Sequence, residues 1–282
     1  NQSKTVENPI FIVGCPRSGT TLLQSLLTAH PQIASFPESH FFPVLRPRRP
    51  YLKLLGLASR QVHQRLREFK DKINSSQAQL TTPRFKIFAK QYVEEFIAVL
   101  NQATLEQGKT IWIEKTPLHL RYIQDIQFFL PRARFIHILR NGIDVVASMY
   151  EVTHQYPEQW KGSRTIDQCV DRWLEDIQES YQYLGHKNHY LVNYDNLVAS
   201  LEPTLKNICN FLGVAFNQSM LTNYSKTAQK VSLKTEPWKV KTGRPITPSH
   251  QSKFEQIFNQ EEQNYILDRI NRAQLSNLEL KS

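Results

Sequence analysis

The feature that most constrains the fold is a set of short apolar segments, each followed by a polar cluster and a helical pattern. The segments are partly β-branched, as buried strands are, and they cover residues 8–14, 110–113, 134–139 and 189–193. Strands that alternate with helices form βαβ units, in which helices cover both faces of a parallel sheet. The sequence therefore predicts an α/β fold with a phosphate-loop-like core, a central parallel sheet of four or five strands and helices on both faces.

The domain organisation is predicted to be simple, because no linker, internal repeat or low-complexity run divides the 282 residues. We expect one domain over residues 1–282, with its core at 8–213 and a C-terminal loop and helix at 214–282. The Pro- and aromatic-rich segment 30–60 is expected to be irregular, residues 61–108 mostly helical and 154–164 a polar loop. A terminal helix is expected from about Ser252.

The chain is basic, with 35 Lys and Arg against 25 Asp and Glu and a formal charge of +10. Such a charge suits nucleic acid, an acidic surface or an anionic small molecule. The basic residues are scattered apart from Arg46, Arg48 and Arg49, so we expect no nucleic-acid partner. No apolar run approaches the roughly 18 residues of a membrane span, and three widely spaced cysteines fit a reducing compartment. A cytoplasmic enzyme without a membrane span is the expectation.

The segment 14–21, Gly-Cys-Pro-Arg-Ser-Gly-Thr-Thr, has the glycine spacing of a phosphate-binding loop between a strand and a helix. Its glycines allow successive amides and the helix N-terminus to face an anion. The lysine of such loops is replaced by Thr20, and Arg17 is the loop's cation. The sequence also lacks the acidic strand end that holds Mg²⁺ in P-loop NTPases. It therefore predicts a site for an anion without a metal.

Four segments in order resemble landmarks of the sulfotransferases that use 3′-phosphoadenosine 5′-phosphosulfate (PAPS). They are residues 16–22, 135–148, 191–198 and 207–213. The first resembles the 5′-phosphosulfate loop of that family. The second resembles its 3′-phosphate motif, a strand that ends in Arg140 with Ser148 eight positions further on. The planar guanidinium of Arg140 suits a phosphate, and a helical Ser148 can add a hydroxyl donor.

The resemblance implies that the chain binds PAPS, releases adenosine 3′,5′-bisphosphate (PAP) and needs no metal. A late basic loop often closes the nucleotide site of this family, which makes Lys241 and Arg244 candidates here. The full set of candidate cofactor-binding residues is Arg17, Ser18, Gly19, Thr20, Thr21, Arg140, Ser148, Tyr194, Lys241 and Arg244.

The resemblance also implies a catalytic set. Arg17 would neutralise the phosphosulfate, and Lys115 could share that role. The small-molecule enzymes place a histidine two positions after the lysine of their Lys-Thr-His turn, but Pro117 stands there. A second branch, which includes tyrosylprotein and several bacterial sulfotransferases, has a catalytic Glu about twenty residues after the loop, where this chain has Glu38. The candidate bases are Glu38 first, His40 in reserve and His119 as a weaker choice.

The expected reaction is an in-line, metal-independent transfer of the sulfuryl group from PAPS to a hydroxyl or amine. A P-loop kinase of a nucleotide or small molecule is the alternative enzyme, and a basic nucleic-acid-binding protein is the alternative of another class. The acceptor stays open among a small-molecule hydroxyl, a sugar and a peptide tyrosine, and a homodimer is one option for the assembly. A trimmed Golgi lumenal domain or a module of a larger synthase is the alternative to a cytoplasmic enzyme.

The segments 30–60 and 154–164 are expected to shape the acceptor pocket. The arginines between positions 46 and 49 would suit an acidic partner, and nearby aromatics would suit a phenol or a lipid. Those aromatics are Phe36, Phe41, Phe42 and Tyr51.

Overall fold

The computed structural model describes residues 9–73, 85–231 and 253–279. Its centre is a five-stranded sheet with the order β2-β3-β1-β4-β5, in which all neighbours are parallel. The strands are β1 (Ile10–Gly14), β2 (Ile33–Ser35), β3 (Ile111–Lys115), β4 (Arg134–Leu139) and β5 (His189–Asn193). The predicted α/β fold with a parallel sheet is confirmed.

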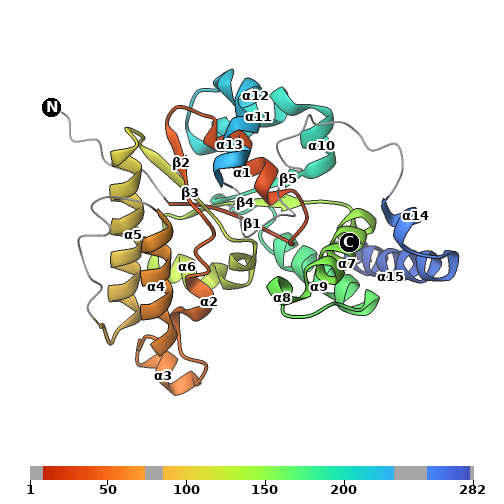
Figure 1. The fold of residues 1–282 in the computed structure, drawn as a ribbon, viewed down its shortest axis with the longest axis horizontal. Helices are drawn as coiled ribbons and strands as arrows, with labels where there is room; N and C mark the ends of the chain where they lie inside the picture. Colours follow the sequence, from red (N-terminus) through yellow and green to blue (C-terminus); the bar gives the residue numbers. More distant parts are fainter. Residues whose placement is uncertain (1–8, 74–84, 232–252, 280–282) are drawn as a thin grey trace.

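Alternating side chains of β1 show how helices come to cover both faces of the sheet. Ile10 and Ile12 pack into one core cluster, whereas Phe11 and Val13 pack into another, because successive residues of a strand point to opposite faces. The first cluster lies against α1 and α10–α13, drawn at the top of Figure 1. These helices are α1 (Thr20–Thr28), α10 (Tyr194–Ala199), α11 (Leu201–Leu212), α12 (Ser219–Thr222) and α13 (Tyr224–Val231).

The opposite face carries an aromatic core that includes Phe42, Phe96 and Phe135. The helices on this face, at the lower left of Figure 1, are α2 (Phe42–Leu45), α3 (Pro50–Leu54), α4 (Arg60–Ile73), α5 (Ala89–Glu106), the 3₁₀ turn η1 (Pro117–Tyr122) and α6 (Ile123–Phe129). The helices at 60–73 and 89–106 agree with the predicted helical region.

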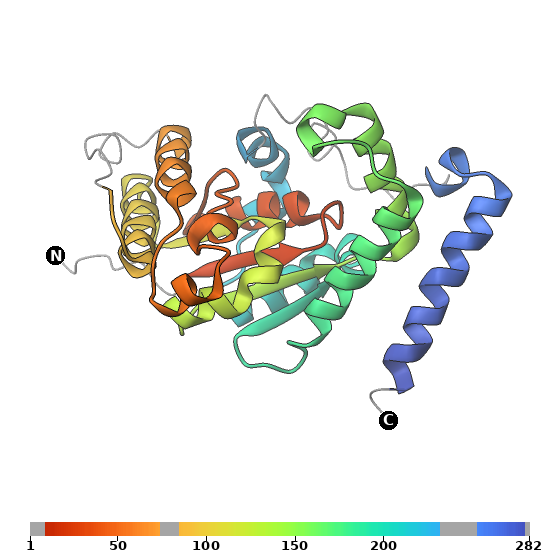
Figure 2. The ribbon, with the colours of Figure 1, turned by 90° about the horizontal axis from the view of Figure 1, so that it is seen from below.

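A third group of helices packs around a core that includes Val146, Trp173 and Ile266. It consists of α7 (Gly142–Gln155), α8 (Pro157–Trp160), α9 (Ile166–Tyr181), α14 (Lys253–Ile257) and α15 (Gln260–Glu279). Figure 2 shows α15 at the side of the molecule, beyond α9 and α7. Within the described ranges, no helix combines the length and the apolarity that crossing a bilayer requires.

Three expectations about local structure were wrong. The segment 30–60 contains the edge strand β2, which is only three residues long and too short to produce a strand pattern. The predicted loop 154–164 begins within α7, and Pro157 at the first turn of α8 starts a further short helix there. The terminal helix is two helices, α14 and α15, instead of one.

Candidate active site

The sheet brings the polar clusters of the sequence to one edge. β1 lies between β3 and β4, and all three are parallel, so their carboxyl ends share an edge, as in other open α/β sheets that bind ligands there. Lys115 ends β3, Arg140 follows β4 and Tyr194 follows β5, while residues 15–19 follow β1. Residues scattered over most of the chain thus lie at the same end of the sheet.

The loop between β1 and α1 has the backbone geometry of an anion-binding turn. The amide of Ser18 donates to the carbonyl of Cys15 over 3.2 Å, and Arg17 (φ 74°) and Gly19 (φ 96°) are left-handed. A Cβ at Gly19 would lie 2.4 Å from Cδ2 of Tyr194, so a side chain has no room there. Gly19 caps α1 without a side-chain hydrogen bond. The amides in the first turn of α1 have no partner inside the helix, so they are available at this loop to bind an anion.

Ser18 supplies a second sign of an anion site in this loop. It is fully buried, and its Oγ has no hydrogen-bond partner among the described residues. Leaving a buried hydroxyl unsatisfied is costly, and such groups in native proteins usually have a ligand or water partner. The two candidates that follow, Thr20 and Thr21, occupy the first turn of α1.

Arg17 is fixed by a residue of the predicted 3′-phosphate motif. Its Nε donates to Oγ of Ser148, on α7, over 3.0 Å. Burial lowers the pKa of the Arg17 guanidinium; the nearby Glu151 carboxylate raises that pKa, and Arg140 lowers it further. A partly desolvated arginine interacts more strongly with an anion than a solvated one does, so the surroundings of Arg17 suit a charged ligand.

Arg140 makes two side-chain interactions at the end of β4. Its Nη2 donates to Oδ2 of Asp144 over 2.8 Å, and its guanidinium carbon lies 4.3 Å from the ring centroid of Tyr194. The Nε atom is buried and has no hydrogen-bond partner among the described residues. Stacking on an aromatic ring fixes the plane of the guanidinium. Arg140 is thus ordered, with one donor still unsatisfied.

Glu38 and Lys115 form an ion pair at the same sheet edge. Nζ of Lys115 donates to Oε1 of Glu38, and Oε2 of Glu38 lies 3.3 Å from Nε2 of His40. The side chains of Lys115, Glu38 and His40 are 2%, 16% and 43% exposed, respectively. The structure therefore places all three candidates in contact with one another through Glu38. Because Lys115 is buried, it is not a solvated surface lysine.

Glu114 takes part in the site although the sequence analysis did not select it. It is 1% exposed, and its Oε1 accepts from Oγ of Ser39 at 2.8 Å and from Oγ1 of Thr116 at 2.6 Å. Its Oε2 lies 2.8 Å from Nδ1 of His119. Burial alone would raise the pKa of the Glu114 carboxyl, but His119 and the hydroxyl donors outweigh burial and lower it. A carboxylate that ends an apolar strand beside Lys115 was the signal that could have identified it.

Two groups of predicted residues do not lie where the sequence analysis expected them. His119 is wrong as a base, because it is fully buried against Glu114 and cannot meet an acceptor. The aromatics Phe36, Phe41 and Phe42 are wrong as an acceptor surface, because all three belong to the core. Lys241 and Arg244 lie outside the described residues.

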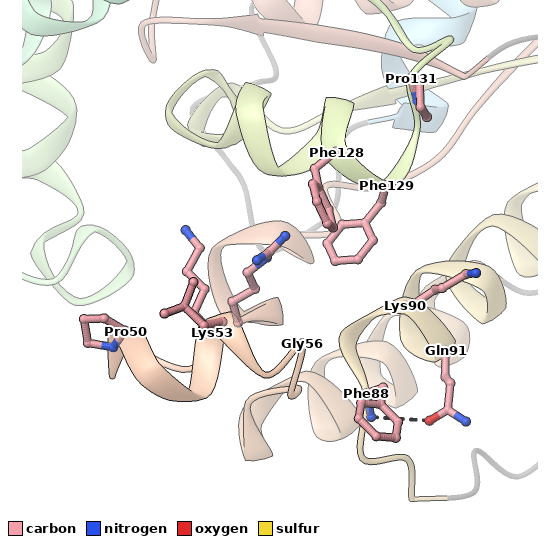
Figure 3. Close-up of a pocket in the computed structure, with 11 residues that line it drawn as sticks. Pro50, Lys53, Gly56, Phe88, Lys90, Gln91, Phe128, Phe129 and Pro131 are labelled. Carbon is pink, nitrogen blue, oxygen red and sulfur yellow. Dashed lines mark hydrogen bonds between the residues drawn. The ribbon is translucent and has the colours of Figure 1, made fainter.

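An apolar pocket lies away from these candidate residues. Its volume is about 970 Å³, and Figure 3 shows Lys53 of α3, Phe88 at the start of α5 and Phe128 of α6 around it. The guanidinium carbon of Arg46 lies 4.9 and 4.8 Å from the ring centroids of Phe128 and Phe129. The pocket lining includes Arg46 and other residues of the segment 30–60, but none of the candidate catalytic or cofactor-binding residues. The described part of the chain also holds no cluster of three His, Cys, Asp or Glu residues that could bind a metal.

Known proteins resemble this chain in sequence. A family model described as "Sulfotransferase family" matches residues 9–218. A protein-tyrosine sulfotransferase of Drosophila melanogaster is 29% identical over 215 residues, which cover 75% of this chain and 39% of the relative. The chain thus spans well under two thirds of that relative's length.

Solved structures share the fold. The sulfotransferase domain of the Synechococcus olefin synthase is 24% identical, with a TM-score of 0.55 and coverage of 95% of this chain and 96% of that chain. A mouse sulfotransferase in complex with PAP is 14% identical, with a TM-score of 0.51 and coverage of 94% and 84%.

Proposed function

The chain belongs to the sulfotransferase family, and from that premise we propose that it transfers a sulfuryl group from PAPS to an acceptor hydroxyl or amine. The observation that carries the proposal is the Glu38–Lys115 pair, which lies at the same sheet edge as the loop 14–19. This arrangement combines a carboxylate that can accept a proton with an anion site, the two things that sulfuryl transfer requires.

The residues at this edge fit the two anionic ends of PAPS. The loop 14–19, the first turn of α1 and Arg17 would hold the 5′-phosphosulfate, where Ser18 has an unsatisfied hydroxyl. Arg140, with its unsatisfied Nε, would hold the 3′-phosphate together with Ser148 and Tyr194. When bound, PAPS supplies an activated sulfuryl group on a phosphate leaving group.

The chain's own residues have separate roles in the proposed reaction. Glu38 accepts the proton of the acceptor hydroxyl at a carboxylate oxygen, and Lys115 fixes the orientation of that carboxylate by its hydrogen bond. Arg17 and the amides at the start of α1 stabilise negative charge that develops on the leaving oxygens. Because these donors are held in place before the reaction, little reorganisation is needed at the transition state.

The kinase alternative is less well supported by the site. Thr20 replaces the lysine of a P-loop NTPase. The expectation that no acidic residue ends an apolar strand was wrong, because Glu114 lies at the end of β3. Its carboxylate, however, accepts from Ser39 and Thr116 and lies 2.8 Å from His119. Calorimetric titration with PAP and with ATP–Mg²⁺ separates the two activities. We expect PAP to bind equally well with and without EDTA; a preference for ATP–Mg²⁺ would instead support a kinase.

The acceptor is identified by incubation with labelled PAPS and candidate acceptors. The named activity of the Drosophila relative suggests a tyrosine peptide, and small-molecule alcohols are tested as well. Sugars complete the screen. Acceptor-dependent PAP release is the expected result, and PAP binding without any transfer in the whole screen would argue for a binding protein.

A further inference from the structure

The buried carboxylate of Glu114 lies beside the Glu38–Lys115 pair, and its contacts suggest a role in the proposed reaction, on which this inference rests. We propose that Glu114 is a positioning residue. Through Ser39 it fixes the segment 38–40 to the end of β3, and so holds the carboxylate of Glu38 where it can meet both Lys115 and an acceptor.

The contacts around Glu114 join two segments that are distant in sequence. Its Oε1 accepts from the backbone amide of Ser39 at 3.1 Å and from the hydroxyl of Ser39 at 2.8 Å. Thr116 strengthens the connection, since its Oγ1 donates to Glu114 over 2.6 Å and accepts from the amide of Ser39 at 3.1 Å. On the other side, Oε2 of Glu114 lies 2.8 Å from His119. The segment is therefore bound through its backbone as well as its side chain.

Neighbouring residues of β3 contact neighbouring residues of this segment. Lys115 contacts Glu38, and Glu114 contacts Ser39. Since successive strand residues point to opposite sides, the two contacts restrain the segment from different directions. Lys115 contacts the side chain of Glu38, whereas Glu114 restrains the backbone of the next residue, Ser39.

The backbone of this segment needs such a restraint. His40 has a φ of 48°, a left-handed conformation that non-glycine residues rarely adopt without support from their surroundings. A buried carboxylate is itself costly unless several donors satisfy it. Accurate positioning of Glu38 accounts for the burial of the Glu114 carboxylate, because small misplacements of catalytic groups strongly reduce rates.

The test compares Glu114→Ala, Glu114→Gln and a matched control, Glu95→Ala. Glu95 pairs with Lys70 and Lys86 between α4 and α5, so its loss also removes a partly buried ion-paired carboxylate but leaves the site intact. For Glu114→Ala we expect the rate of transfer at saturating PAPS to fall about 100-fold while the Kd of PAP stays within about twofold. Glu114→Gln should recover to within about fivefold of the wild type, because its amide oxygen can accept from Ser39 and its NH₂ can donate to His119.

A second measurement needs no acceptor. Hydrogen exchange of the peptide that covers residues 36–41 should be at least about tenfold faster in Glu114→Ala than in the wild type, and unchanged in the loop 14–19. Equal exchange, or an equal rate loss in Glu114→Ala and Glu95→Ala, would overturn the positioning role. Failure of the proposed function is distinguishable, because the wild type itself would then consume no PAPS with any acceptor.

Discussion

The anion-binding loop and the Glu38–Lys115 pair are built in different ways. The loop 14–19 is one contiguous segment, in which backbone amides and Gly19 supply the site. The pair joins residues 77 positions apart and depends on the buried contacts of Glu114 and Ser39. The two parts should therefore have different roles. Substitutions in the loop 14–19 and at Arg140 should affect cofactor binding, and substitutions at Glu38 or Lys115 should affect the rate of transfer.

The largest expected effect is that of Glu38→Gln. Removing the proposed base should lower the rate of transfer about 10³-fold, within the range measured for general bases, while PAP binding stays unchanged. Rates at saturating PAPS and calorimetric titration with PAP measure the two quantities. His40→Gln is the matched control, since His40 lies beside Glu38; if the His40 variant lost the rate and the Glu38 variant did not, His40 would be the base.

Gly19→Ala should have the next largest effect, on binding. The new Cβ would lie 2.4 Å from the Tyr194 ring in a backbone conformation that favours glycine, so the loop or the ring must move. We expect the Kd of PAP to rise about 100-fold and the Tm to fall, because strain of this kind costs about 1–3 kcal/mol. Gly56→Ala is a control for the cost of the backbone conformation without a steric clash, since Gly56 also has a positive φ but no atom near its Cβ position. A normal Kd in Gly19→Ala would contradict the role of the loop.

Arg140→Ala should weaken PAP binding about tenfold to 100-fold, the loss expected for a charge-assisted hydrogen bond. The rate at saturating PAPS should fall much less. Asp144→Asn is the companion variant, since Asp144 accepts from Nη2 of Arg140 and its neutralisation leaves the arginine present. Calorimetry with PAP and with adenosine 5′-phosphate separates the 3′-phosphate contribution. The Arg140 variant should lose most of the wild-type preference for PAP over adenosine 5′-phosphate, and an undiminished preference would refute the assignment.

The last prediction concerns the pH dependence of stability and tests whether acid acts on the site or on the fold. Burial, together with its partner His189, lowers the pKa of His137 to about 3, and burial lowers that of His189 to about 4. Both therefore stay neutral in the fold while the unfolded chain protonates them near 6.5. The free energy of unfolding should fall as the pH drops from 6.5 towards 4, by up to about 1.4 kcal/mol per pH unit for each histidine. Urea unfolding at several pH values measures this slope.

His137→Phe should reduce the pH dependence of the free energy of unfolding. The decline of the transfer rate at low pH should stay unchanged, because the contacts of His137 within the described residues are with His189 and Tyr183 and not with the site residues. If this substitution changed the pH at which the transfer rate falls, loss of the fold, and not protonation of Glu38, would limit the rate at low pH.

The parts of the site that could be predicted are those formed by residues close together in the sequence or directly after a clear strand. Arg17, Ser18 and Gly19 are adjacent, and Arg140 directly follows a clear apolar strand, so their positions at one sheet edge follow from a parallel sheet. Lys115 was identified in the same way. Glu114 was missed although it ends an apolar strand beside Lys115, because its contacts with Ser39 and His119 arise only in the fold.

The sequence by itself determined the α/β class and the anion loop, because strand and helix periodicity and an amide-lined turn are properties of contiguous residues. Only the tertiary structure decided which carboxylate meets Lys115 and what holds it there. The deciding element is β2, whose three residues pair with β3 so that Ser35 lies opposite Ile113. The chain after Ser35 thereby reaches the chain after Ile113, and Glu38 and Ser39 meet Lys115 and Glu114. A strand that short has too few residues to show a pattern, so its contacts could be found only in the fold.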